Sequence, residues 1–285
     1  MVIEKIVNSI WNEFVYGGHL LSFGAVSIVY TASILLDIRI TWDFLLVVYL
    51  GTESVYLYNR FKEYKVDFLT NPERTEHIKK YVKYIPFIIF LMTFSAIVMV
   101  VYFNKISALI LGLLLLILGL FYSLFFKKIT EKIIAFKSLF VSLIWASLVI
   151  FLALYYSLPL TFALVLIFVF VFLRFIISTT FFDFKDMESD KKENLLTLPV
   201  IFGEKKLRNT LGIVAILATI PIAFGIYLKI FPKSSLMLLF TIPYTFYYLG
   251  KLGDKKMNVA FLYNVIIDGE FILWLPLILL GKNLL

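Results

Sequence analysis

The chain has 285 residues, of which 61% are hydrophobic, and its mean hydropathy is +0.95. This composition excludes a soluble globular domain, which is far less apolar, and indicates an integral membrane protein. The formal net charge is +8, from 27 Lys and Arg against 19 Asp and Glu, and the absence of cysteine excludes disulfides, thiolate chemistry and iron–sulfur or zinc–thiolate sites.

The first 16 residues predict an amphipathic helix that lies in the membrane interface. Ile3, Ile6, Val7, Ile10 and Phe14 recur at helical spacing, and polar residues separate them. The stretch carries charges and no short apolar core followed by small residues, so it does not resemble a cleavable signal peptide. A merely frayed chain end is the alternative.

Nine apolar stretches follow, each about 18–23 residues long and therefore able to cross roughly 30 Å of hydrocarbon. They lie near residues 18–36, 41–58, 84–103, 106–126, 138–156, 160–182, 210–229, 234–250 and 259–281. No soluble domain fits between them. We therefore expect a single all-α membrane domain over residues 1–285, built as a bundle of nine transmembrane helices.

The basic residues predict the orientation of this bundle. Seven Lys and Arg lie between spans two and three, four between spans four and five, six between spans six and seven, and three between spans eight and nine. With Lys5, 21 basic residues lie on one side and five on the other, while Arg174 lies within a span. The positive-inside rule places the N-terminus and the 21 residues in the cytoplasm. This topology and anionic lipid headgroups explain the net charge without nucleic acid, and no protein partner is implied.

Two long cytoplasmic loops, residues 59–83 and 183–209, each begin with the pattern Phe-Lys-acid-x-x-x-Asp. The two copies are four spans apart, which suggests two four-helix halves with the ninth helix as an addition. Long charged loops in a compact bundle usually carry function. Parallel repeats of this kind tend to place a shared site between the halves.

The oxygen-bearing residues of each copy form a trio on one helix face, spread over roughly 60–80° at 3.6 residues per turn. The trios are Asn59, Glu63 and Asp67 in the first copy and Asp183, Asp186 and Asp190 in the second. Six oxygen ligands without His or Cys suit a hard cation such as Mg²⁺, which prefers carboxylates together with substrate phosphates. Two such ions across a cavity could bridge a diphosphate. The alternative is that these acids only keep the loop helices soluble.

Basic residues near both motifs suit the same ligand, because Lys and Arg bind phosphate oxygens. Arg74 follows the first motif and Lys191 the second, while Lys127 lies beyond Tyr122 at the end of span four. Simple anchoring on the cytoplasmic side is the alternative for these basic residues.

These motifs resemble those of the UbiA superfamily of intramembrane prenyltransferases. The run DFKDMESDKKENLLTLPVIFG, residues 183–203, is similar to the second aspartate motif of that family. The segment from Asn59 to Arg74 is similar to its first motif, and Tyr122 with Lys127 to its tyrosine–lysine element. The first motif departs from the family pattern at two positions that are usually aspartate. Arg60 occupies one and lowers the local negative charge, and Glu63 occupies the other.

The resemblance implies Mg²⁺-dependent ionisation of an isoprenyl diphosphate, followed by attack of an aromatic or other lipophilic acceptor on the allylic cation. Both trios would hold Mg²⁺. The implied catalytic acids are Asp67, Asp186 and Asp190. The implied substrate-binding residues are Asn59, Arg74, Tyr122, Lys127 and Lys191. The prenyl tail would lie along apolar helix faces, with access from the surrounding membrane lipids.

Two other functions stay open. A terpene cyclase would keep the ionisation step but would form its product from the diphosphate alone. A transporter would need ion sites near the middle of the bilayer, whereas both trios lie at the ends of spans.

Charged residues inside the predicted spans cost about 2.5–3.5 kcal/mol each at mid-span. Glu53, Arg174, Asp268 and Glu270 are therefore expected to pair or to face a cavity. His19, near the start of span one, could bind an acceptor or be structural.

Overall fold

The computed structural model describes residues 2–64, 71–122, 127–254 and 256–284, and the regular structure in these ranges is entirely helical. The α-helices in chain order are α1 (Val2–Asn12), α2 (His19–Leu35), α3 (Trp42–Glu63), α4 (Pro72–Lys79), α5 (Ile85–Tyr102), α6 (Ile106–Phe121), α7 (Phe136–Tyr155), α8 (Phe162–Lys192), α9 (Leu198–Phe202), α10 (Glu204–Leu217), α11 (Ile220–Tyr227), α12 (Thr241–Lys251), α13 (Val259–Phe261) and α14 (Asp268–Leu284). Short π-helical and 3-10 segments extend or connect them, namely η1 (Glu13–Gly17), η2 (Val82–Tyr84), η4 (Lys127–Glu131), η5 (Lys233–Phe240) and η6 (Leu262–Ile267).

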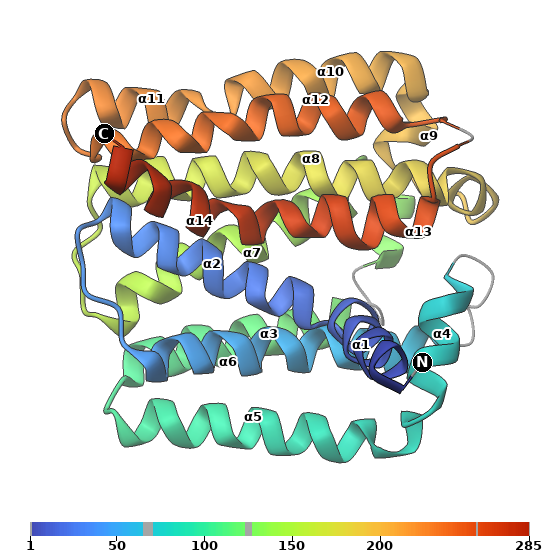
Figure 1. Cartoon of the computed structure of the whole chain (residues 1–285), viewed down its shortest axis with the longest axis horizontal. Coiled ribbons are helices and arrows are strands. Elements are labelled where there is room, and N and C mark those ends of the chain that lie inside the picture. The colour runs from blue at the N-terminus through green and yellow to red at the C-terminus, as the bar shows by residue number, and fades with distance from the viewer. Residues whose placement is uncertain (1, 65–70, 123–126, 255, 285) are drawn as a thin grey trace.

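The long helices lie side by side, and both acidic motifs reach the same end of the bundle (Figure 1). We call this the motif end: it comprises the C-terminal ends of α3 and α8 together with α4 and α9. A hydrogen bond from Lys185 Nζ to Asn71 Oδ1 joins the two motif regions there. At the opposite end, Thr41 N donates to the Tyr156 hydroxyl at 2.8 Å, next to the starts of α3 and α8.

Five helical segments in the described ranges are long and apolar enough to cross a membrane. They are Val82–Tyr102, Phe136–Tyr155, Phe162–Lys192, Glu204–Tyr227 and Val259–Leu284. The bent pair formed by the N-terminal helix and α2 is a sixth candidate if it is one broken span. Among the other predicted spans, α3 carries several charged residues and α6 has 16 residues. The segments support a membrane bundle, and the count of nine spans stays a prediction.

The N-terminal segment consists of α1 and the π-helical η1, which meet α2 at an angle of 66°. Ile6, Val7, Ile10 and Trp11 of α1 are all about half exposed, so the helix presents an apolar face outside the bundle. The bend occurs at Gly18, whose φ of +121° is a conformation that side chains rarely adopt. Location of this segment at the membrane interface remains a prediction.

α8 is one helix of 31 residues, and it continues well past residue 182, where the sixth apolar stretch ends. No Gly or Pro interrupts it, and Thr161 caps its first turn. It ends where Asn194 adopts a φ of +56° and Leu195 N bonds back to Asp190 O at 2.9 Å. The second motif is therefore held on rigid helix rather than on a loop.

Aromatic packing joins α7, α8 and α14 at the centre of the largest hydrophobic core. The Trp145 and Phe175 ring centroids are 4.3 Å apart, and those of Phe175 and Phe271 are 4.0 Å apart, both in stacked orientation. Such stacks add to the energy of burying the rings. They fix the relative position of the helices that carry the candidate site.

A buried ion pair connects α8 with α14. Arg174 Nε donates to Glu270 Oε1 at 2.9 Å, and Arg174 Nη2 also donates to Thr245 Oγ1 on α12 at 2.7 Å. Arg174 and Glu270 are almost completely buried, so either charge would be costly to bury without the other. The expectation that intramembrane charges pair holds for these two residues.

Candidate active site

The three aspartates of the second motif lie on the face of α8 that is turned into the bundle. Asp183 is fully buried, Asp190 is 3% exposed and Asp186 is half-buried. Glu188 and Ser189, on the other side of the helix, are exposed. This burial agrees with the shared face that the i, i+3, i+7 spacing predicts.

The first turn of α7 supplies two partners to Asp183. Lys137 Nζ lies 2.7 Å from Asp183 Oδ1, and Ser138 Oγ donates to Oδ2 at 2.8 Å. Lys137 also lies within electrostatic reach of Asp186 and Asp190. Neither Lys137 nor Ser138 was predicted from the sequence. The available signal was a lysine at the very start of a predicted span, where one face of the helix already points inward.

The structure places only part of the first trio. Asn59 lies on α3 and lines the cavity described below, while Glu63 is the last residue of that helix. Asp67 lies outside the described residues, so its predicted roles in metal binding and catalysis stay predictions. Lys127 opens the short segment η4, and its predicted contact with substrate stays a prediction as well.

Arg60 points away from the aspartates of α8. Its Nη1 donates to the backbone oxygen of Tyr16, and a Cβ added to Gly18 would lie 3.0 Å from the same nitrogen. A side chain at Gly18 would also lie 2.9 Å from Glu53 Oε1, so the bend between η1 and α2 needs glycine for space as well as for its φ. The structure therefore directs the positive charge of Arg60 towards the N-terminal segment.

A second acidic group, Asp268, reaches the motif end from α14. It is 8% exposed, and the charges of Arg60, Arg74 and Lys185 act on it. Asp268 directly follows the π-helical η6, and such bulges are frequent at functional sites. Arg74 is half-buried on α4, whereas Lys191, another predicted substrate contact, is exposed at the end of α8.

Glu13 of η1 ties the N-terminal segment to α4. His77 Nε2 lies 2.6 Å from Glu13 Oε2, and the Tyr81 hydroxyl donates to Oε1 at 3.2 Å. Hydrogen bonding to His19 and then to His77 holds the pKa of Glu13 at about 2, against burial, which raises it. The Tyr16 hydroxyl donates to Glu73 on α4 as well. These contacts fix the helix that carries Arg74.

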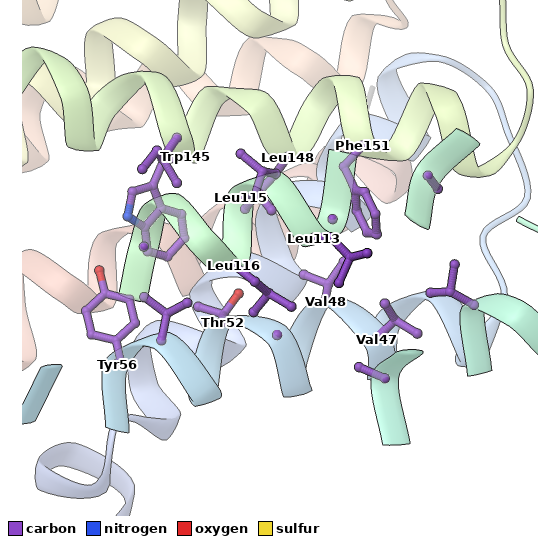
Figure 2. Close-up of a pocket in the computed structure, with 18 of the residues that line it drawn as sticks. Val47, Val48, Thr52, Tyr56, Leu113, Leu115, Leu116, Trp145, Leu148 and Phe151 are labelled. Carbon is purple, nitrogen blue, oxygen red and sulfur yellow. The ribbon is translucent and has the colours of Figure 1, made fainter. Parts of the chain in front are cut away.

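An apolar cavity of about 250 Å³ lies between α3, α5, α6 and α7 and extends along the bundle (Figure 2). Asn59 and Tyr122 line it where α3 and α6 approach the motif end. Tyr56 lies near that end in Figure 2, and Val47 and Phe151 lie at the other. The cavity thus begins among polar groups and ends among apolar ones.

Electrostatic contact connects this cavity with the aspartate face. Tyr122 lies within reach of Lys137, which is the ion-pair partner of Asp183. The Tyr122 ring also stacks on Phe140 of α7, with centroids 5.8 Å apart. Asn59, Tyr122 and the aspartates are therefore brought together at one end of the cavity.

A buried carboxylate oxygen of the aspartate face is available to a hard cation. Asp190 Oδ2 is buried and has no hydrogen-bond partner in the part of the chain that the structure describes. A buried acceptor of this kind is costly unless something satisfies it. Within the described ranges no three Asp, Glu, His or Cys side chains are gathered closely enough to hold an ion. Two predicted ligands do not contribute to such a group here: Asp183 contacts Lys137 and Ser138, and Asp67 lies outside the described residues.

Solved structures with this fold cover nearly the whole chain. One is the apo structure of a UbiA homologue from Aeropyrum pernix K1, with 14% identity, a TM-score of 0.68, and coverage of 92% of this chain and 97% of that one. Another is a UbiA homologue from Archaeoglobus fulgidus bound to DMAPP and Mg²⁺, with 17% identity, a TM-score of 0.61, and coverage of 96% and 99%. A digeranylgeranylglyceryl phosphate synthase matches with 17% identity, a TM-score of 0.61, and coverage of 97% and 98%.

At these identities the structural likeness concerns the fold. A search of curated proteins finds no match. The model of the UbiA prenyltransferase family, in contrast, matches residues 20–267, which is most of the chain and includes both acidic motifs. The chain therefore belongs to the UbiA prenyltransferase family.

Proposed function

We propose that this protein is a Mg²⁺-dependent intramembrane prenyltransferase, which moves an isoprenyl group from its diphosphate to a lipophilic acceptor. One observation carries the proposal: the buried aspartate face of α8, with Lys137 beside it, adjoins the polar end of an apolar cavity. Such an arrangement suits a ligand with an anionic head and a long apolar tail. The Archaeoglobus fulgidus homologue, whose structure contains DMAPP and Mg²⁺, supports the same class of donor.

The residues that would hold Mg²⁺ are Asn59, Glu63, Asp67, Asp183, Asp186 and Asp190. Bound Mg²⁺ would neutralise the negative charge that develops on the departing diphosphate. Lys137 supplies a positive charge within reach of the second trio, and Arg74 supplies another at the motif end. In this proposal Lys137 pairs with Asp183 before substrate binds and donates to diphosphate oxygens afterwards.

The cavity can stabilise the positive charge on the reacting carbon and keep water away from it. When the bond between the allylic carbon and the diphosphate oxygen breaks, its electrons leave with the diphosphate and the carbon becomes positive. Tyr56 and Trp145 line the cavity near its polar end, and aromatic faces stabilise cations. The apolar walls exclude water, which would otherwise capture the cation. The acceptor then forms the new bond to this carbon and releases a proton.

The surrounding topology belongs to the same proposal. Nine spans, an N-terminus in the cytoplasm and an interfacial helix over residues 1–16 would place the motif end at the cytoplasmic surface of the cell membrane. The charge bias of 21 basic residues to five supports this orientation. A water-soluble diphosphate head would then reach the site from the cytoplasm, and the lipophilic acceptor from the bilayer.

The test uses membranes that contain the protein, labelled isoprenyl diphosphates, and extracted lipids as a source of acceptor. Prenyl transfer predicts a labelled lipid product that requires both Mg²⁺ and the extract. A labelled hydrocarbon or alcohol formed without extract would instead identify a terpene cyclase. Diphosphate release that does not need Mg²⁺, or none with any donor, would contradict the proposal.

A further inference from the structure

Two of the helices that line the apolar cavity, α3 and α7, give its length. From Asn59 to Val47, α3 lines it over twelve residues, or about 18 Å at 1.5 Å per residue. From Val141 to Phe151, α7 lines it over ten residues, or about 15 Å by the same rise. The cavity therefore measures roughly 15–18 Å from the polar end to its far end.

Phe151 lies at this far end of the cavity together with Val47 (Figure 2). It is 5% exposed, and its ring lies against Phe44, with centroids 5.6 Å apart, and against Tyr155 at 6.3 Å. Both supporting residues are completely buried. A Cβ added to Gly112 of α6 would lie 3.2 Å from Phe151 Cε2, so the ring is also closely packed on its α6 side. Because it is supported on several sides, this ring cannot retreat to admit a longer ligand.

Gly51 marks an open position partway along the cavity. It lines the cavity on α3, eight residues or about 12 Å from Asn59. A Cβ added at Gly51 would meet no atom within 4 Å, so space is available there for a side chain. That space is part of the cavity, and a larger residue at this position would shorten it.

We infer that the length of this cavity selects isoprenyl diphosphates of three or four isoprene units. Phe151 stops the end of the chain, and the absence of a side chain at Gly51 lets chains longer than two units enter. The inference rests on the proposed function. One isoprene unit adds four chain bonds of about 1.5 Å, or roughly 5 Å when extended. The full cavity thus holds three to four units, and the part before Gly51 holds about two.

The experiment measures binding and turnover separately. Binding is followed by thermal stabilisation with Mg²⁺ and isoprenyl thiolodiphosphates, whose carbon–sulfur bond resists ionisation, in chains of two, three, four and five units. Turnover uses the corresponding diphosphates. The variants are Gly51→Leu, which shortens the cavity, and Phe151→Leu, which moves its far end back. Gly250→Leu is the matched control, because Gly250 is also helical, also has nothing within 4 Å of an added Cβ, and lies outside the cavity.

We expect the unmodified protein and Gly250→Leu to prefer three or four units. Gly51→Leu should keep its affinity for two units and lose affinity for four by at least about tenfold, since one or two units lose their apolar contacts. Phe151→Leu should raise the relative affinity for five units. An unchanged order of affinities in Gly51→Leu, or a preference for two units in the unmodified protein, overturns the inference. If the affinities depend on chain length as expected but no donor is turned over, the inference stands and the proposed function is rejected.

Discussion

Replacement of Lys137 by methionine tests the role that the structure assigns to this residue. The substitution leaves the fully buried carboxylate of Asp183 with Ser138 as its remaining hydrogen-bond partner. Loss of one member of a buried ion pair costs about 3–5 kcal/mol, and the 19% exposure of the Lys137 side chain places the expected cost at the lower end of that range. Loss of a charged hydrogen bond to the diphosphate costs a further 1.5–3 kcal/mol of binding, or roughly 10- to 100-fold in affinity.

The assay combines unfolding of the purified protein in detergent with the KM for an isoprenyl diphosphate. Lys137→Met should lower stability and raise KM, whereas the double variant Lys137→Met/Asp183→Asn should recover most of the stability but not the affinity. Lys132→Met is the matched control, because Lys132 is an exposed lysine five residues before Lys137, and it should change neither quantity. A KM that is unchanged in Lys137→Met would refute the assignment of this lysine to the diphosphate.

Three further outcomes follow from the buried polar groups. Glu270→Gln leaves Arg174 charged and buried, so we expect a loss of about 3–5 kcal/mol of stability by denaturant unfolding, whereas Arg174→Met/Glu270→Leu should be close to neutral. Glu13→Gln should weaken the contact between η1 and α4, which would be measured as faster hydrogen exchange of the backbone amides of α4. Because the pKa of Glu13 is lowered from 4.5 to about 2, this contact should contribute fully above about pH 4.5 and be lost as the pH falls towards 2, and the Gln variant should lack that transition.

Hydropathy and helical spacing predicted the parts of the fold that depend on local sequence. Within the described residues each apolar stretch is helical over most of its length, because a long apolar run in lipid must satisfy its backbone groups internally. The stretch 210–229 is divided between α10 and α11, and 234–250 between η5 and α12. The aspartates that share one helix face predicted that α8 continues through the second motif, although hydropathy gives no signal in this polar segment. The absence of Gly and Pro as far as Lys192 is consistent with that extent.

Contacts between distant segments could not be predicted in the same way. Asp183 and Lys137 belong to different helices and are joined only by the packing of α7 on α8. No spacing rule connects residues so far apart, so the lysine beside the aspartates was overlooked in favour of Lys127. The direction of Arg60 was equally hidden, because it depends on how the N-terminal segment folds back on α3.

The central claim is that the aspartate face of α8 acts on a diphosphate together with Mg²⁺. The most direct test is Mg²⁺-dependent release of diphosphate from an isoprenyl donor by Asp190→Asn, with Glu188→Gln as the control, because Glu188 is exposed on the opposite side of the same helix. We predict that Asp190→Asn lowers the rate on the order of 100-fold and raises the Mg²⁺ concentration needed for half-maximal release, whereas Glu188→Gln behaves like the unmodified protein. Equal rates and equal Mg²⁺ dependence in the two variants would contradict the account.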